Sequence, residues 1–286
     1  MPTPRSSVAD RRRRFHALHR SGCFVIPNPW DVGSARWLQG LGFAALASTS
    51  SGMAWSLGRA DNQVTRDDAL AHLRTLVEAT ELPLNADFEN GFAADPAGVA
   101  ANVRLAAATG VAGLSIEDST GDAAQPLFTL DEAVARLRAA RAAIDEAGGE
   151  PDTRPMLVGR FEGWLTGQTS LAETLHRLQA YAEAGADVLY APGLKAPDDI
   201  AAVVAAVAPK PVNLLVGGAS ALTVADIAAL GVRRISVGGG LARAAWAAFQ
   251  RAAQTLAVEG RFDGFAGAAS GAELDAFFAQ DGGRAG

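Results

Sequence analysis

The feature that most constrains this chain is an alternation of short apolar runs with longer, alanine-rich segments, repeated eight times. The apolar runs have the length of buried strands, and the segments between them carry apolar residues at the three- and four-residue spacing of amphipathic helices. This alternation is typical of βα units that build a parallel sheet. The expected strands are 23–27, 44–49, 82–87, 113–117, 156–160, 188–191, 212–216 and 234–237.

Eight such units favour a closed (β/α)8 barrel (TIM barrel), although the pattern alone is also compatible with an open doubly wound sheet. The length of 286 residues suits one barrel with an appendage. We therefore expect a single α/β domain over residues 1–286, with a helical lead-in over 1–21 and a helical tail over 260–286. The tail carries large apolar side chains that need burial, which favours a helix that docks or is exchanged between subunits.

Charge and cysteine content exclude several kinds of partner. The 31 acidic and 25 basic residues give a net charge of -6, so no general basic field attracts nucleic acid or an anionic membrane. The basic run 11–14 is interpreted as the solvated start of a helix, with phosphate binding as the alternative. Cys23 is the only cysteine, which excludes an intrachain disulfide. With no secretory leader and no membrane-length apolar run, we expect a cytoplasmic protein.

Charged side chains gather where the third, fourth and fifth strands are expected to end. In (β/α)8 barrels the active site lies at this end of the strands, and here the positions are Asp87, Glu117 and Arg160. All four histidines fall on expected helices, so a histidine-based relay or zinc site has little support. Hard oxygen ligands without histidine or thiolate favour Mg²⁺ or Mn²⁺. The competing interpretation is an ion-pair network that braces the barrel mouth.

Other candidate sites are weaker. The first βα turn, 27–31, lacks the glycine fingerprint of a dinucleotide site. Three consecutive glycines at 238–240 fit either a phosphate-binding loop or a tight turn into the last helix. Lys195, just beyond the sixth strand, is the only candidate for a Schiff-base aldolase, which needs a lysine near the barrel mouth.

Eight segments, taken in order, resemble the isocitrate lyase and phosphoenolpyruvate mutase superfamily. They are Pro-Asn-Pro-Trp-Asp-Val-Gly-Ser-Ala-Arg (27–36), Thr-Ser-Ser-Gly-Met (49–53), Leu-Gly-Arg-Ala-Asp (57–61), Asn-Ala-Asp-Phe-Glu-Asn-Gly-Phe (85–92), Ser-Ile-Glu-Asp-Ser (115–119), Gly-Arg-Phe-Glu (159–162), Ala-Gly-Ala-Asp (184–187) and Gly-Val-Arg-Arg-Ile-Ser-Val-Gly (231–238). The resemblance runs from about residue 15 to 265. It implies a metal-dependent barrel that acts on C–C or C–P bonds of 2-oxo acids, as a dimer or tetramer with an exchanged C-terminal helix.

The resemblance also implies a set of metal-site residues. Asp87 is similar to a metal ligand of the family, and Glu117 to a direct or water-mediated one. Asp61 is similar to a catalytic carboxylate outside the metal's own ligand set. Asn85 stands where many members carry a first metal-binding aspartate, so we keep it as a candidate ligand with one negative charge fewer.

Substrate contacts follow from the resemblance in the same way. Arg160 is similar to the arginine that contacts substrate, and Ser51, Gly52 and Met53 to the segment that holds a substrate carboxylate. Asn213 on the seventh strand is a further candidate for substrate binding. When the bond beyond a 2-oxo carbon breaks, an enolate charge develops, which Mg²⁺ and an arginine would stabilise.

The segment after the fourth strand, 119–128, departs from the known activities of the superfamily. It lacks the Lys-Lys-Cys-Gly-His type signature of the lyases that cleave isocitrate and methylisocitrate, and the lysine and asparagine of phosphonopyruvate enzymes. We therefore expect a Mg²⁺-dependent lyase, decarboxylase or hydrolase that cleaves a C–C bond of a small 2-oxo acid, with its proton donor unassigned. The alternatives are C–P chemistry and a non-catalytic 2-oxo acid binding protein.

Overall fold

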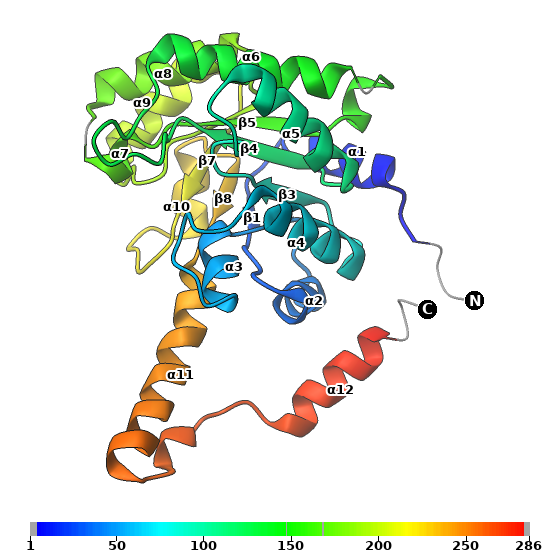
Figure 1. Cartoon of the computed structure of the whole chain (residues 1–286), viewed down its shortest axis with the longest axis vertical. Helices are drawn as coiled ribbons and strands as arrows, with labels where there is room; N and C mark the ends of the chain where they lie inside the picture. The colour runs from blue at the N-terminus through cyan, green and yellow to red at the C-terminus, as the bar shows by residue number, and fades with distance from the viewer. Residues whose placement is uncertain (1–4, 147, 168, 283–286) are drawn as a thin grey trace.

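Figure 1 shows the computed structural model, which describes residues 5–146, 148–167 and 169–282. In this part of the chain eight parallel strands form one sheet in the order β1-β8-β7-β6-β5-β4-β3-β2. The order runs from β1 round to β2, so the expected (β/α)8 barrel is confirmed. The strands are β1 (Phe24–Ile26), β2 (Leu46–Ala47), β3 (Leu84–Asp87), β4 (Gly113–Glu117), β5 (Met156–Arg160), β6 (Val188–Tyr190), β7 (Val212–Leu215) and β8 (Arg234–Ser236).

Helices cover the outside of the barrel, and several begin where the sequence supplies a capping side chain. Thr65, Thr129 and Thr223 each form a capping box, in which the threonine and an acid three residues later bond to each other's backbone N–H. The helices are α1 (Val8–Leu18), α2 (Val32–Gly40), α3 (Ser50–Ser56), α4 (Arg66–Ala79), α5 (Pro96–Ala108), α6 (Leu130–Asp145), α7 (Gly163–Thr166), α8 (Leu171–Glu183), α9 (Pro197–Val207), α10 (Val224–Ala229), α11 (Gly240–Glu259) and α12 (Gly271–Gly282).

The seam between β1 and β2 is closed by few bonds. The N–H of Ala47 donates to the carbonyl of Pro27 at 3.1 Å. The side-chain amide of Asn28 donates to the carbonyl of Ser48 at 2.8 Å, and its oxygen accepts from the two N–H groups that follow β8, each at 2.9 Å. Asn28 is buried, so one side chain joins β1, β2 and β8 at the barrel mouth.

The basic run in α1 corrects our interpretation of a solvated helix face. Arg11 is buried and donates to the carbonyl of Val77 in the last turn of α4. Arg12 is half-buried and donates to the carbonyl of Ala107 in the last turn of α5. Only Arg13 and Arg14 are exposed. The physical reason is that the last carbonyls of a helix lack backbone partners and carry partial negative charge, which guanidinium groups satisfy.

The C-terminal helices leave the barrel and return to it (Figure 1). α11 projects away from the strands, and α12 turns back so that the ring of Phe277 lies 4.4 Å from that of Trp37 on α2. Large apolar side chains on α11 and just after it stay exposed in the single chain, namely Trp246, Phe249, Val258, Phe262 and Phe265. The expected tail therefore docks in part, whereas its exchange between subunits stays a prediction. Residues 1–4 and 283–286 of the expected lead-in and tail lie outside the described residues.

Membrane insertion has no support in the described helices, because none of them combines the length and the apolar character needed to cross a bilayer.

We predict that His19, at the end of α1 below the barrel, makes the protein less stable in acid. Burial lowers the pKa of His19 to about 3, and its Nδ1 lies 2.8 Å from the carbonyl of Phe15. The unfolded chain takes up this proton near pH 6.5, so stability is lost as the pH falls from there towards 3, by up to about 1.4 kcal/mol per pH unit.

Urea unfolding between pH 7 and pH 4 measures this effect. The slope of unfolding free energy against pH should be shallower for His19→Asn than for the wild type. The exposed His176 supplies the control variant His176→Asn, which should keep the wild-type slope. Parallel slopes for the wild type and His19→Asn would contradict the prediction.

Candidate active site

A cavity of about 190 Å³ lies at the C-terminal ends of the strands. Its lining includes Ser51, Asp61, Asp87 and Arg160, which the sequence had singled out. Two larger hollows, of about 740 and 750 Å³, lie beside α11 and the loops after β6 and β7, and no carboxylate is among the residues that line them. The smaller cavity, which charged side chains line, is therefore the candidate active site.

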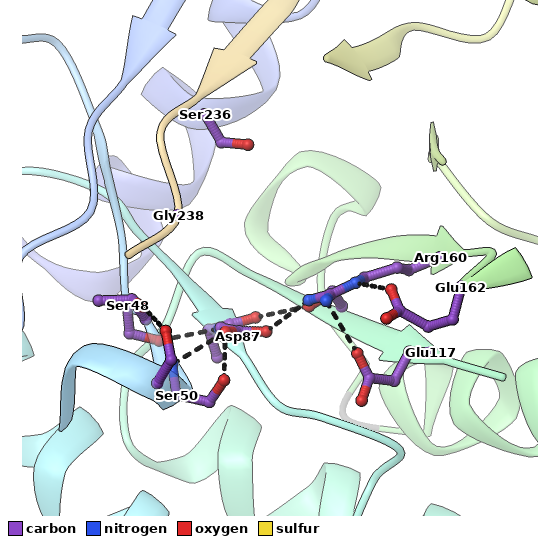
Figure 2. Close-up of polar contacts among 12 residues, drawn as sticks. Ser48, Ser50, Asp87, Glu117, Arg160, Glu162, Ser236 and Gly238 are labelled. Carbon is purple, nitrogen blue, oxygen red and sulfur yellow. Dashed lines mark hydrogen bonds and ion pairs between the residues drawn. The ribbon is translucent and has the colours of Figure 1, made fainter. Parts of the chain in front are cut away.

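Arg160 is the centre of this site (Figure 2). Its Nη1 lies 3.0 Å from Oδ1 of Asp87, its Nη2 3.2 Å from Oε2 of Glu117, and its Nε 2.5 Å from Oε1 of Glu162. The sheet register explains the convergence, since Glu117 and Arg160 are direct neighbours on β4 and β5, and Asp87 ends the next strand, β3. One guanidinium thus contacts three carboxylates.

Asp87 is held from both sides. While Arg160 contacts Oδ1, the other oxygen, Oδ2, accepts hydrogen bonds from the backbone N–H of Ser50 at 2.9 Å and from its hydroxyl at 2.8 Å. The N–H of Asp87 donates to the hydroxyl of Ser48 at 2.8 Å. Figure 2 shows the carboxylate between these serines and the guanidinium. The carboxylate expected to bind metal is therefore fixed in one orientation.

The site holds more acid than one arginine can neutralise. Burial raises the pKa of Glu117 well above its ordinary value, against the opposing effect of Arg160. Burial and the neighbouring Asp87 also raise the pKa of Asp61, and raise that of Glu89 to about 8. Glu89 has a positive φ of 45°, and its Oε1 is buried without a hydrogen-bond partner. This excess of carboxylates favours binding of a cation.

The donor atoms fit Mg²⁺ better than a metal that needs a full protein cage. Within the described ranges, no three or more histidine, cysteine, aspartate or glutamate side chains form a cluster that could hold a metal alone. Mg²⁺ commonly uses one or two carboxylates and keeps several waters. Asp87 and Asp61 both line the cavity, so an ion held by Asp87 and water, with Asp61 nearby, fits these residues.

Asn85 and Asn213 lie deeper in the barrel than Asp87. The side-chain oxygen of Asn85 accepts from Nη1 of Arg234 at 3.3 Å, and that of Asn213 accepts from Nε of Arg234 at 2.8 Å. Both candidates line the cavity, but both oxygens bond to an arginine. Arg234 is a residue of the cavity that the sequence did not lead us to expect. The sequence pattern that could have predicted it is the alternation of polar Arg234 and Ser236 around apolar Ile235 on β8, which places both polar side chains on the inner face.

The three residues expected to hold a substrate carboxylate are placed differently from one another. Ser51 lines the cavity, and its hydroxyl lies 3.1 Å from that of Thr49. The N–H of Gly52 donates to the Thr49 hydroxyl at 3.3 Å, and the N–H of Met53 to the Thr49 carbonyl at 3.0 Å. Two of the three N–H groups are thus engaged within the first turn of α3.

The remaining candidates lie away from this cluster or are already bonded. Lys195 is exposed in the loop after β6 and lines one of the larger hollows instead. Among the glycines at 238–240, the N–H of Gly238 donates to Asn28 and that of Gly240 to the carbonyl of Val237. These bonds favour the tight turn over a phosphate-binding loop.

A buried side chain that the resemblance did not single out supports the arginine cluster from behind. Oδ1 of Asp118 accepts from the N–H of Glu162 at 2.9 Å, and Oδ2 accepts from the hydroxyl of Tyr181 at 2.6 Å and from Arg177 at 3.0 Å. Asp118 therefore fixes the backbone that carries Glu162, one of the three acids on Arg160.

Comparison with known proteins agrees with this geometry. Residues 15–257 match the family described as phosphoenolpyruvate phosphomutase. The chain belongs to this family. A Burkholderia cenocepacia crystal structure with a provisional lyase/mutase assignment is 47% identical, covers 95% of this chain and 96% of its own, and superposes with a TM-score of 0.89.

Two further relatives have assigned activities. An oxaloacetate decarboxylase of Bradyrhizobium diazoefficiens is 30% identical over 209 residues, which are 69% of this chain and 68% of that protein. The structure of a phosphonopyruvate hydrolase in complex with oxalate and Mg²⁺ is 26% identical, covers 96% of this chain and 97% of its own, and has a TM-score of 0.82. The resemblance found in the sequence is confirmed.

We predict that Arg160→Met lowers the free energy of unfolding by about 3 kcal/mol, because it leaves three mostly buried carboxylates without their shared cation. Denaturant unfolding at neutral pH measures the loss. The exposed pair of Arg59 and Asp68 supplies the control, since Arg59→Met should cost less than about 1 kcal/mol. Equal losses for the two variants would contradict the prediction.

Proposed function

We propose that this protein is a Mg²⁺-dependent lyase, decarboxylase or hydrolase that cleaves a C–C bond of a small 2-oxo acid. Asp87 and Arg160 line a cavity of about 190 Å³ and Glu117 contacts the same guanidinium, and this arrangement is the observation that carries the proposal. A cavity of this size suits a small acid and leaves little space for a large substrate. The similarity to an oxaloacetate decarboxylase supports the same class of reaction.

The residues of the chain would share the work as follows. Mg²⁺, when bound, supplies Lewis-acid stabilisation of the oxygen on which negative charge develops. Asp87, fixed by Ser50, would hold that ion. Arg160 keeps a positive charge beside the reacting carbonyl, where the enolate charge appears as the bond breaks. Glu117 and Glu162 hold the guanidinium in place, so that no reorganisation is needed during the reaction.

One assay distinguishes the proposal from two alternative functions. C–P cleavage is favoured by the similarity to a phosphonopyruvate hydrolase, and a binding protein without catalysis is the other. Purified protein with Mg²⁺ is given a panel of 2-oxo acids, 2-hydroxy acids and phosphonopyruvate, and products are followed by NMR. Product from a 2-oxo acid supports the proposal, product from phosphonopyruvate alone supports C–P chemistry, and tight binding without product supports the binding protein.

We predict that Asp87→Ala abolishes turnover and also Mg²⁺-dependent binding of oxalate, because it removes the carboxylate that would hold the ion. Turnover should fall by at least about 1,000-fold, the scale of losing an essential electrostatic group. NMR assays and calorimetry measure the two effects. Asp131→Ala, at an exposed position in the first turn of α6, is the matched control and should change neither. Unchanged Mg²⁺-dependent binding in Asp87→Ala would show that the ion is held elsewhere.

We also propose that the protein is a cytoplasmic homo-oligomer, a dimer or tetramer, in which a second copy covers the exposed apolar side chains of α11. Phe249 is 61% exposed and Trp246 36% exposed, and their rings contact each other. Large neighbouring aromatic groups in water are typical of an interface.

For the oligomer we predict that Phe249→Glu shifts the assembly towards the monomer, because a buried charge at the interface has no partner. Sedimentation analysis measures the mass against that of the 29.4 kDa chain. The control Leu105→Glu places the same charge at an apolar position on α5 that is 40% exposed, and should leave the mass unchanged. A wild type that sediments as a monomer would contradict the proposal.

A further inference from the structure

Arg234 is a buried cation that has no carboxylate partner in the described part of the chain. It lies on β8 with an exposed fraction of 3%. Its Nε donates to the side-chain oxygen of Asn213 and its Nη1 to that of Asn85, both of which are neutral amides. The partly buried Arg160 and the buried Arg177, by contrast, each contact acids. Arg234 therefore keeps an uncompensated positive charge inside the barrel.

The position of Arg234 is the floor of the candidate active site. Alternate residues of a strand point to the same face, so Arg234 lies one inward layer below Ser236, just as Asn85 lies one layer below Asp87. All four residues line the same cavity of about 190 Å³. The third nitrogen of Arg234, Nη2, has no hydrogen-bond partner among the described residues. A ligand in the cavity can therefore supply one.

The charge of Arg234 is less well compensated by the protein than that of Arg160. Burying a guanidinium without a counter-charge is costly, and burial lowers the pKa of Arg234 to about 10. Asn85 leaves this charge in place, whereas an aspartate at the same position would neutralise it. Arg160 differs, because each of its three nitrogens already contacts a carboxylate of the protein. An incoming acid thus meets its unsatisfied cation on the floor of the cavity.

We propose that Arg234 binds a carboxylate group of the ligand at the floor of the cavity and is thus a substrate-binding residue in its own right. The proposal rests on the proposed function only in taking the ligand to be a small acid. In this arrangement Arg160 acts on the reacting carbonyl from the mouth, while Arg234 anchors the acid from below. Charge-assisted hydrogen bonds from a guanidinium fork are well suited to a carboxylate.

Calorimetric titration with oxalate tests the proposal, once with Mg²⁺ and once with EDTA. Arg234→Gln should weaken oxalate binding at least tenfold in both media, and Arg234→Lys, which keeps the charge, should lose less. Arg233→Gln is the matched control, since the neighbouring Arg233 donates to the carbonyl of Gly22 outside the cavity and should change nothing. Oxalate affinity within twofold of wild type in Arg234→Gln would overturn the proposal, as would a wild type that binds no oxalate.

A second variant keeps the test valid if Arg234→Gln fails to fold. Asn85→Asp places a carboxylate beside Arg234 and should weaken oxalate binding with EDTA by a similar factor. If the two residues act together, adding Asn85→Asp to Arg234→Gln should cause little further loss. Tighter oxalate binding in Asn85→Asp with EDTA would overturn the proposal. Turnover separates the two proposals. If the enzyme is active but Arg234→Gln leaves the oxalate affinity unchanged, only the anion subsite is refuted. If oxalate binding depends on Arg234 but no substrate is turned over, only the catalytic function is refuted.

Discussion

The site depends on a single guanidinium that has to neutralise several acids at once. Arg160 ends β5, and parallel pairing brings the end of β4 beside it and the end of β3 next in line. Without the arginine, Asp87 and Glu117 would repel each other in a mostly buried place. Because the cation is shared, each acid keeps part of its negative charge uncompensated. The same interaction therefore stabilises the barrel mouth and prepares it for a second cation.

The strand pattern of the sequence predicted the fold well, and the reason is periodicity. Every observed strand lies inside its predicted range, and β4 and β5 agree in full because their apolar runs end at charged residues. The strand-end rule also predicted that Asp87, Glu117 and Arg160 lie together. Linear patterns do not encode how buried cations find acceptors across the fold. For this reason the carbonyl contacts of Arg11 and the inward position of Arg234 came only from the structure.

Two arginines divide the inside of the barrel into layers of different charge. At the mouth, the carboxylates outnumber Arg160, the one cation that they share. One layer deeper in the barrel, the guanidinium of Arg234 bonds to two neutral amides. An electric field therefore runs along the barrel axis between the two layers. In the proposed arrangement the carboxylate of a small acid would face the positively charged lower layer. The uncharged side chain of Asn85, which accepts from Arg234, keeps the two layers distinct.

The seam between β1 and β2 at Asn28 is the place where the barrel is expected to open locally. Most neighbouring strands share several ladder bonds, but β1 and β2 are joined by one backbone bond and this amide. Local opening begins where bonds are fewest, so amide exchange should be fastest along this line of the sheet. Ser48 and Ser50, which orient Asp87, directly follow β2. Because β2 pairs with β3 and the N–H of Ser48 donates to the carbonyl of Asn85, these serines and Asp87 lie on the same side of the seam, so a transient opening would leave the orientation of the carboxylate intact.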